Sequence, residues 1–263
     1  MSYAVVAGHN EIIPGAAGNG YQEHVVARQV KDRVIHYLCQ LGETAHDCTD
    51  DVGRNKTQVW MNAAKNCNKA IGKNGYIIAI HLNSNGGNPG TGTEVLDYKG
   101  TQKAFCQRIS ARLAKEFAWK DRGWKDGSGI GLIEETEAPV IYIELCFINN
   151  ISDITKLIRN IDTAAIAIAE EITGKKVAAV KSGSGPYKVI IPNTAVWQTR
   201  GLVEEFTKRG YKAYGWNGKN TFSNGLDESD PFMFIIETDS NWGPVVVQEL
   251  KNRGYDRTYG EAI

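Results

Sequence analysis

The chain lacks long hydrophobic runs. No window approaches about 18 uninterrupted apolar residues, the length at which a helix can begin to span a bilayer. The start of the chain, "MSYAVVAGHN", also lacks the basic segment, apolar core and small-residue cleavage site of a signal peptide. We therefore expect no membrane insertion and a protein that is made in the cytoplasm of its host cell.

Cysteine is scarce, and its spacing is not that of a metal site or a disulfide framework. The five cysteines form an odd set without a Cys-x-x-Cys pair, and they occupy positions 39, 48, 67, 106 and 146. Disulfides are rare in cytosolic proteins. The pattern predicts reduced thiols that are mostly buried.

An excess of charge of one sign is absent as well. Thirty basic residues balance thirty acidic ones, with 18 against 20 in residues 1–174 and 9 against 10 in residues 187–263. Neither part has the basic surplus that binding to nucleic-acid phosphates needs, so we expect no nucleic-acid partner. The other three positive charges lie between the two parts, at Lys175, Lys176 and Lys181.

Apolar runs that alternate with helical patterns are what the sequence does contain. The runs predict strands at 3–7, 76–82, 93–98 and 139–147. The helical patterns cover 21–41, 57–72, 101–119 and 150–173, with a break expected near Asp162. Segments rich in Gly, Asn and Asp predict loops at 49–56, 83–92 and 121–131. Together they predict an α/β domain whose open, mostly parallel sheet carries helices on both faces.

A smaller domain is predicted after this one. "TGKKVAAVKSGSGPYK" (173–188) has the composition of a flexible connector, which places a larger first domain at 1–174, a linker at 175–186 and a second domain at 187–263. In the second domain, "YKVII" with "VWQTRGLVEEFTKRGYKAYG" is echoed by "FMFII" with "NWGPVVVQELKNRGYDRTYG" about 45 residues later. Each copy reads strand, helix, glycine turn, strand, so two copies predict a small α+β domain of βαββαβ pattern.

Side chains suited to metal or proton chemistry stand at the ends of the predicted strands. His9 follows the first strand, His81 ends the second, Glu144 lies near the end of the last, and Glu23 opens the first helix. In open α/β sheets, crevices form beyond the carboxyl ends of the strands, so these four side chains are expected to converge.

Each of the four residues also has a simpler interpretation. His9 alone is typical of a loop or core histidine, Glu23 of a charge at a helix start, His81 of a hydrogen-bonded core group and Glu144 of a salt-bridged one. Together they favour a site, because a buried charge is costly unless it is paired or bound to a metal. Two imidazoles and one carboxylate suit a zinc ion with an open fourth position.

The segments "AGHN", "PGAAGNGYQEHVVARQV", "IIAIHLNS" and "APVIYIELCFINNISD" resemble the zinc-dependent N-acetylmuramoyl-L-alanine amidases, which cut bacterial peptidoglycan. The resemblance covers nearly all of residues 1–174. It implies one zinc ion held by His9, Glu23 and His81, with Glu144 as the catalytic carboxylate. It further implies that Asn83 orients the substrate or the ligand residues.

The chain departs from the family pattern at two places. "NEIIPG" supplies Asn10, Glu11 and two isoleucines where the family usually has glycine or asparagine-glycine and then an aspartate before Pro-Gly. Ala79-Ile80 replaces the usual Ser-Ile before the second histidine. Neither change removes a ligand, and both are expected to reshape the rim of the site and hence the substrate preference.

The second domain resembles the sporulation-related repeat domains that bind peptidoglycan glycan strands. Aromatic side chains suit the apolar faces of sugars, which makes Trp197 and Trp242 candidate substrate-binding residues, with core packing as the alternative for each. The same βαββαβ order also occurs in a common RNA-binding module, but the balanced charge and the missing basic-Gly-aromatic signature argue against RNA.

These resemblances imply a modular enzyme that hydrolyses the amide between N-acetylmuramic acid and L-alanine. Because the chain lacks a secretion signal although its substrate lies outside the cytoplasm, we expect a phage endolysin that reaches the bacterial cell wall after release. The alternatives are a bacterial autolysin of lysing mother cells, with the same chemistry, and a peptidoglycan-binding protein without catalysis.

Overall fold

The computed structural model describes residues 1–87, 90–177, 186–208, 211–216, 232–239, 246–247, 250–251, 255 and 257–262. The chain divides into two compact units, Met1–Ala178 and Ala179–Ile263. The first unit contains a six-stranded sheet, a two-stranded sheet of β2 (Ala17–Gly18) and β3 (Tyr21–Gln22), and two apolar cores. The second unit contains a four-stranded sheet and one apolar core, and each unit is described by itself.

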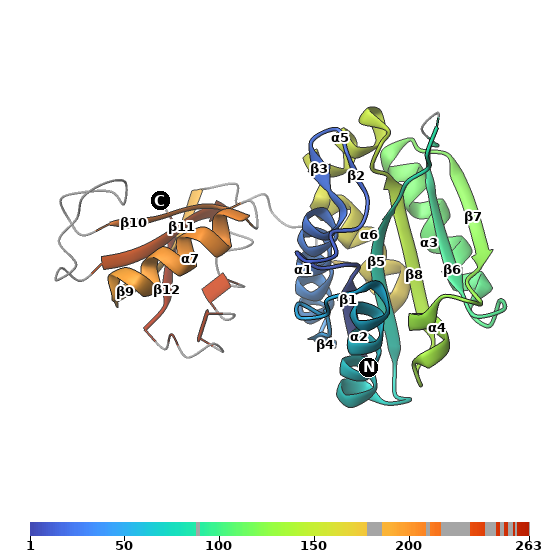
Figure 1. Ribbon diagram of the computed structural model, residues 1–263, viewed down its shortest axis with the longest axis horizontal. Coiled ribbons are helices and arrows are strands. Elements are labelled where there is room, and N and C mark those ends of the chain that lie inside the picture. Colours follow the sequence, from blue (N-terminus) through green and yellow to red (C-terminus); the bar gives the residue numbers. More distant parts are fainter. Residues whose placement is uncertain are drawn as a thin grey trace. The chain divides into compact units, whose positions relative to one another are not determined.

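A six-stranded sheet forms the centre of the first unit (Figure 1). Its spatial order is β4 (Thr44–Asp47), β1 (Ser2–Ala7), β5 (Tyr76–Asn83), β8 (Val140–Phe147), β6 (Thr93–Asp97) and β7 (Asp121–Asp126). Four of the neighbouring pairs are parallel, and the β6–β8 pair is antiparallel. The prediction of an open, mostly parallel sheet is confirmed.

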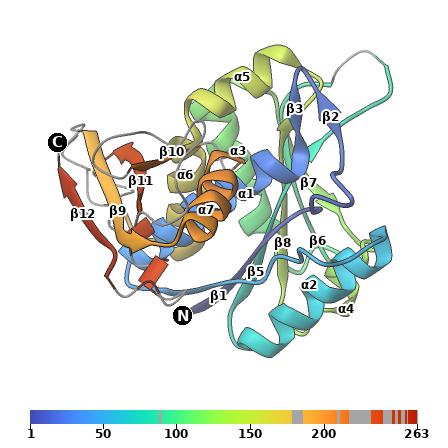
Figure 2. The same cartoon turned by 60° about the vertical axis from the view of Figure 1, so that its left-hand side comes forward.

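Helices cover both faces of this sheet (Figure 2). One face packs against α1 (Glu23–Gln40), α3 (Lys103–Phe117), α5 (Ile151–Arg159) and α6 (Ile161–Thr173). The other face packs against α2 (Lys56–Ile71) and the short α4 (Gly131–Glu135). The expected break in the last helical segment is present, and it falls at Asn160, between α5 and α6.

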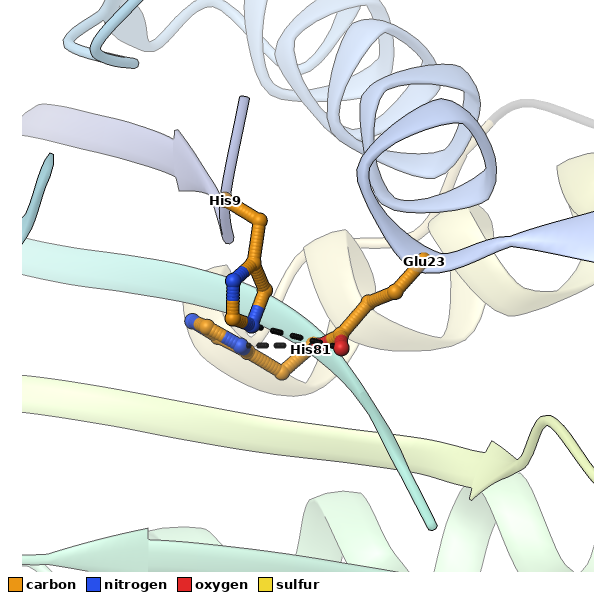
Figure 3. A group of neighbouring side chains, drawn as sticks. All are labelled: His9, Glu23 and His81. Atoms are coloured by element: carbon orange, nitrogen blue, oxygen red, sulfur yellow. Dashed lines mark hydrogen bonds and ion pairs between the residues drawn. The ribbon is translucent and has the colours of Figure 1, made fainter. Parts of the chain in front are cut away.

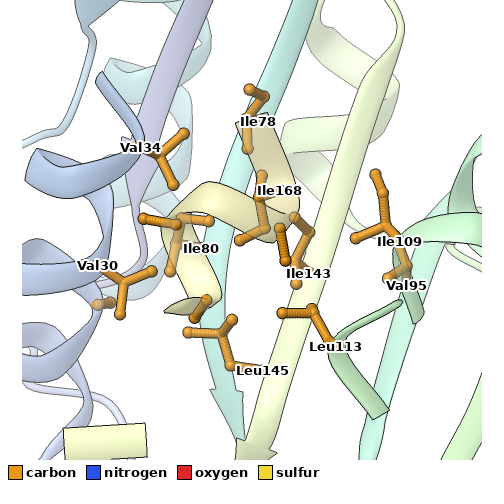
Figure 4. Close-up of a cluster of buried hydrophobic side chains, with 14 of the residues drawn as sticks. Val30, Val34, Ile78, Ile80, Val95, Ile109, Leu113, Ile143, Leu145 and Ile168 are labelled. Atoms are coloured by element: carbon orange, nitrogen blue, oxygen red, sulfur yellow. The ribbon is translucent and has the colours of Figure 1, made fainter. Parts of the chain in front are cut away.

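The apolar core on the α1 and α3 side is the larger of the two in this unit (Figure 4). Alternate residues of the inner strands enter it, while the residues between them enter the core under α2 and α4. In β5, for example, Ile78 and Ile80 face α1, whereas Ile77 and Ala79 face α2. Because both faces are covered, the inner strands β1, β5 and β8 read as largely continuous apolar runs in the sequence.

The two edge strands are where the sequence-based prediction was wrong. Segment 121–131 was expected to be a loop, but it contains β7 and the start of α4, and β4 was not anticipated. β4 and β7 are the outermost strands of the sheet. Their side chains are largely half-buried or exposed, so the apolar signal that marks a buried strand is missing from both.

Two predictions about burial can be compared with the structure directly. Four of the five cysteines are buried and Cys39 is exposed, as expected for a mostly buried set. In the described part of the chain, no helix combines the length and apolar character that crossing a bilayer requires.

The second unit contains a four-stranded sheet of spatial order β10 (Lys212–Trp216), β11 (Phe232–Asp239), β9 (Pro186–Thr194) and β12 (Tyr259–Ala262). All three neighbouring pairs are antiparallel. The helix α7 (Val196–Lys208) packs Leu202 and Phe206 against strand residues of β9 and β11. Residues 246–247 and 250–251 are also helical. The described elements therefore follow the order expected for the βαββαβ pattern.

The predicted linker begins against the first unit. Lys176 Nζ and Val177 N donate to the Glu170 carboxylate at 2.8 Å and 3.0 Å, and Lys175 Nζ pairs with Glu43 at 2.5 Å. Residues 178–185 of the predicted linker lie outside the described residues.

Candidate metal centre and neighbouring carboxylates

His9 occupies a backbone conformation that ordinary residues seldom adopt. It follows β1 with φ at 64°, in the left-handed region. Gly8 before it lies so close to β5 that a Cβ atom there would come within 2.6 Å of His81 Nε2. Glycine at position 8 therefore lets the two histidine rings approach each other.

The Asn10 side chain orders the loop after His9, which accounts for the first residue of the unusual "NEII" segment. The Asn10 side chain is fully buried; its Oδ1 accepts from Ile12 N at 3.0 Å and from Ile13 N at 2.8 Å. Its Nδ2 donates to Asp50 Oδ2 at 3.0 Å and to the Gly53 carbonyl at 2.9 Å. Asn10 thus ties the turn that carries His9 to the loop after β4, a task that an exposed loop residue cannot perform.

Glu23 begins α1 and is almost completely buried, with 4% of its surface exposed. Its Oε2 accepts from Ala16 N at 2.9 Å, and its Oε1 accepts from Leu82 N at 3.1 Å. A Cβ atom on Gly15 would lie 2.5 Å from the same carboxylate, so the glycine of the Pro-Gly turn makes room for it. The carboxylate is therefore fixed by backbone groups from two separate segments.

The structure brings His9, Glu23 and His81 together (Figure 3). Glu23 Oε2 lies 3.2 Å from His9 Nε2, and Glu23 Oε1 lies 3.0 Å from His81 Nδ1. The two imidazole rings meet edge to face, with their centroids 5.3 Å apart. His81 also stacks on Tyr142 of β8 at 4.3 Å, a contact that the sequence analysis did not anticipate.

The protonation states of Glu23 and His81 favour the binding of a cation. Burial raises the pKa of Glu23, but hydrogen bonds from His81 and His9 outweigh burial and hold that pKa below its ordinary value. Burial also lowers the pKa of His81, although Glu23 opposes the shift. A charged carboxylate beside a neutral imidazole is the state in which these side chains ligate metals.

The geometry of the three residues fits a metal ion. One ligand atom from each lies within 4.8 Å of the others. The donor set combines imidazole nitrogens with a carboxylate oxygen, and its single negative charge is buried without a lysine or arginine to balance it among the contacts of Glu23. His9, Glu23 and His81 can therefore hold a metal ion.

Glu144 lies on β8 beside this group. In the sheet register it is directly opposite His81 of β5 and Glu94 of β6. Its Oε2 atom is buried and has no hydrogen-bond partner within the described residues. Burial and the nearby charges of Glu23 and Glu94 raise the pKa of Glu144 to about 8. An unpaired buried carboxyl group of this kind is typical of a group that acts on a substrate or water.

Glu94 and Arg122 are charged neighbours of Glu144 that the sequence analysis did not select. Arg122 Nε donates to Glu94 Oε2 at 2.7 Å, and Asn83 Nδ2 donates to Glu94 Oε1 at 2.8 Å. The amide nitrogen of Asn83 is thus engaged by Glu94. A glutamate inside the apolar run "TEVLDY" was the available signal for Glu94, whereas Arg122 lies in the segment that was expected to be a loop.

The two tryptophans selected in the second unit are not tested by the structure. Trp197 belongs to α7, but its side chain lies outside the described residues, as does the whole of Trp242. Their role in substrate binding stays a prediction.

The sheet with helices on both faces and the His-Glu-His group define an α/β protein with a candidate metal centre, and the family follows from the sequence. Residues 4–174 match the family model described as N-acetylmuramoyl-L-alanine amidase (Amidase_3). The match spans more than half of the chain. The chain therefore belongs to this family.

Curated relatives include proteins from phages and bacteria. The chain is 27% identical over 233 residues to the endolysin of Bacillus phage SPP1, an alignment that covers 81% of each protein. It is 28% identical over 169 residues to the N-acetylmuramoyl-L-alanine amidase LytC of Bacillus subtilis, covering 61% of this chain and 32% of that protein. An uncharacterized protein of Clostridium perfringens is 28% identical over 184 residues, which cover 67% of this chain and 53% of that protein. The chain thus spans about half or less of the length of these last two relatives.

Solved structures share the fold of the first unit. The catalytic domain of the CD27L endolysin, which targets Clostridia difficile, has a TM-score of 0.60 at 21% identity, covering 68% of this chain and 99% of that domain. The N-acetylmuramoyl-L-alanine amidase AmiC2 of Nostoc punctiforme has a TM-score of 0.57 at 22% identity, covering 65% of this chain and 95% of that one. At such identities the likeness establishes the fold.

Proposed function

We propose that the protein is a zinc-dependent N-acetylmuramoyl-L-alanine amidase that hydrolyses the amide between N-acetylmuramic acid and L-alanine in bacterial peptidoglycan. The observation that carries the proposal is the juxtaposition of His9, Glu23 and His81 with Glu144, whose buried Oε2 has no hydrogen-bond partner among the described residues. Family membership supplies the substrate and the bond.

His9, Glu23 and His81 are the proposed zinc ligands. A zinc ion held there would supply Lewis acidity to the amide carbonyl and to the attacking water. The protein's part is to hold the three ligands rigidly. Ala16 N and Leu82 N orient Glu23, Tyr142 supports the His81 ring, and Asn10 fixes the turn that carries His9.

Glu144 is the proposed general base and acid. It takes a proton from the attacking water and returns that proton to the nitrogen of the leaving L-alanine. Its pKa of about 8 in the protein alone reflects burial and two neighbouring carboxylates. A divalent cation beside it favours the charged form, so the site sets its basicity by two opposing effects.

The biological setting that we propose is cell lysis by a phage endolysin. The alignment with the endolysin of phage SPP1 supports it, since it extends beyond the catalytic unit and covers 81% of each chain. In this setting the protein acts at the cell wall after release from the cytoplasm, and the second unit keeps it on the polymer and raises its local concentration there. A bacterial autolysin with the same chemistry is the alternative, favoured by the similarity to LytC.

Analysis of digested peptidoglycan tests the proposed reaction. Purified cell walls are incubated with the protein, with and without a chelator, and new end groups are measured. We expect new L-alanine amino termini without new reducing sugars, and we expect the chelator to abolish them. New reducing sugars, or new amino termini other than those of L-alanine, would reject the amidase assignment.

A further inference from the structure

Charged side chains of the first unit form a row across neighbouring strands, starting at the metal-binding group. His81 of β5 is opposite Glu144 of β8, and Glu144 is opposite Glu94 of β6. Residues that are directly opposite each other in a sheet point to the same face. The row continues to β7, where Arg122 donates to Glu94 at 2.7 Å. The arginine is thus part of the same surface as the proposed reaction centre.

The guanidinium group of Arg122 is held in place on one side. Its Nε donates to the buried Glu94 carboxylate, which Asn83 fixes from the other side at 2.8 Å. Its Cζ lies 5.0 Å from the centroid of the Phe147 ring. An arginine with one hydrogen bond and one ring contact of this kind has lost much of its rotamer freedom before any ligand binds.

The outer edge of this guanidinium group, which carries the two Nη groups, can contact a ligand. The Arg122 side chain is 29% exposed, and within the described residues neither of its Nη groups donates to a protein acceptor. Two parallel N–H donors on a planar, preorganised group match the two oxygens of a carboxylate. Glu94 contacts the Nε side of the guanidinium group, and Asn83 contacts Glu94, so neither residue covers this outer edge.

The substrate of the proposed reaction carries carboxylates on one side of the bond that is cleaved. The lactyl carboxyl group of N-acetylmuramic acid is consumed in the amide bond itself, so the remaining carboxylates belong to the stem peptide. The nearest one to the bond is the α-carboxylate of the acidic residue that follows L-alanine. A free carboxylate on the glycan side is not available for Arg122.

The spacing along the sheet agrees with this position. Neighbouring strands are about 4.8 Å apart, so the Glu94–Arg122 pair over β6 lies roughly 10 Å from His81 on β5. A peptide extends by at most about 3.5 Å per residue, which places the second residue of the stem peptide roughly 7 Å from the cleaved amide. The remaining few ångströms are within the reach of an arginine side chain.

We propose that Arg122, positioned by Glu94 and Asn83, binds the α-carboxylate of the second stem-peptide residue and so favours peptidoglycan in which that carboxylate is not amidated. The inference rests on the proposed amidase function and adds a substrate class to it. A carboxamide at the same place offers one oxygen acceptor, and its NH₂ group faces an Nη donor, which leaves two donors opposed. The pair with Glu94 is electrically neutral, so recognition depends on the direction of these hydrogen bonds.

Kinetics on two defined substrates test the inference. Muramyl tripeptides with L-alanine, a γ-linked D-glutamate and L-lysine are prepared with the glutamate α-carboxylate either free or amidated, so that they differ in one group. For the wild-type protein we expect a lower KM with the free carboxylate. Arg122→Lys and Arg122→Gln are each expected to raise the KM for this substrate by roughly 10- to 100-fold, because neither side chain can offer the two parallel N–H donors of a guanidinium group. With the amidated substrate we expect less than about a threefold change.

Three controls separate recognition from folding. Arg122→Lys keeps a positive charge next to Glu94, and the double variant Glu94→Gln with Arg122→Gln leaves no unpaired charge behind. Both are expected to remain folded and to lose the discrimination. Arg108→Gln is the matched control, because Arg108 also pairs with a glutamate, Glu171 at 3.6 Å, and lies over a phenylalanine ring at 4.4 Å, but on the outer helix α3. It is expected to keep the wild-type preference.

The outcomes distinguish the two proposals. If the wild-type protein hydrolyses both tripeptides but Arg122→Lys and the double variant change both KM values equally, the inference is wrong and the amidase function stands. A wild-type protein that prefers the amidated tripeptide also overturns the inference alone. If the wild-type protein releases no peptide from either substrate in the presence of zinc, the proposed function fails and the inference fails with it.

Discussion

The two faces of the central sheet serve different purposes, although they are made of alternate residues of the same strands. In β8, Ile143 and Leu145 enter the apolar core under α1, α3 and α6, while Glu144 between them points to the face that carries His81 and Glu94. The first face buries aliphatic side chains, whereas the second has an apolar core under α2 and α4 and also carries Glu144 and Glu94 beside His81. In the described part of the chain, Glu144 Oε2 on this second face is buried without a hydrogen-bond partner. We infer that the apolar packing on both sides of the sheet supplies the stability that allows the second face to keep a buried carboxyl group without a partner.

The largest effect is expected for Glu144→Gln. Removing a general base typically costs about 10²- to 10⁴-fold in rate, so we expect a loss of this size in peptidoglycan hydrolysis with zinc still bound. The raised pKa of Glu144 means that the folded, metal-free protein resists ionising this group. Stability is therefore lost as the pH rises from the ordinary value of 4.5 through about 8, and the metal-free variant should be at least as stable as the wild type at pH 8.

Urea denaturation and a cell-wall lysis assay check both parts of this prediction. If the Glu144→Gln variant retains more than about a tenth of wild-type activity, Glu144 is not the general base. A variant that is much less stable would instead show that this carboxyl group stabilises the fold.

The opposite result is expected for the adjacent residue on the other face. Ile143 is fully buried, and truncation of such a side chain to alanine costs about 2–5 kcal/mol through lost burial and a residual cavity. We expect Ile143→Ala to lower the free energy of unfolding by this amount, measured in urea, while the activity per folded molecule stays near that of the wild type. A full loss of activity in a variant that remains folded would contradict the separation of the two faces.

A paired buried carboxylate provides the third comparison. Glu170 on α6 accepts from Lys176, Val177 N and Arg112, unlike Glu144. Burial raises the pKa of Glu170, but these partners outweigh burial and lower the pKa overall. Glu170→Gln should therefore destabilise the protein by about 1–2 kcal/mol at pH 7.

The pH dependence of this effect follows from the sign of the shift. A carboxyl group with a lowered folded-state pKa contributes stability above its ordinary pKa, and that contribution disappears as the pH falls through the lowered value. The difference between Glu170→Gln and the wild type should accordingly shrink below about pH 4.5. The neighbouring Glu171, with arginine contacts of 3.6 Å and 3.7 Å, is the matched control, and Glu171→Gln should cost less than half as much. Equal losses at pH 7 and pH 3.5 for Glu170→Gln would show that charge plays no part.

The inner sheet and the candidate metal-binding residues were predictable from the sequence for a physical reason. The inner strands β1, β5 and β8 are buried on both faces, so each is marked by a largely continuous apolar run, and polar residues at the ends of those runs stand out. His9 and His81 are such residues, and the structure places both beside Glu23. The edge strands β4 and β7 have no such run.

The missed parts of the site follow from the missed strand. Arg122 belongs to β7, and without that strand the sequence offers no reason to place it next to Glu94. Asn10 departs from the family pattern, but its role depends on contacts with Asp50 and Gly53, which are 40 and 43 positions further along the chain. Long-range contacts of polar side chains leave no periodic trace in a single sequence.

The metal content of purified protein tests the central claim most directly. Wild-type protein and His81→Ala are equilibrated with zinc, freed of excess ion, and analysed by mass spectrometry for metal per chain, with His46→Ala as a control on the edge strand β4. We predict one zinc ion per chain for the wild type and for His46→Ala, and a large loss for His81→Ala. One zinc ion per chain retained by folded His81→Ala would contradict the account.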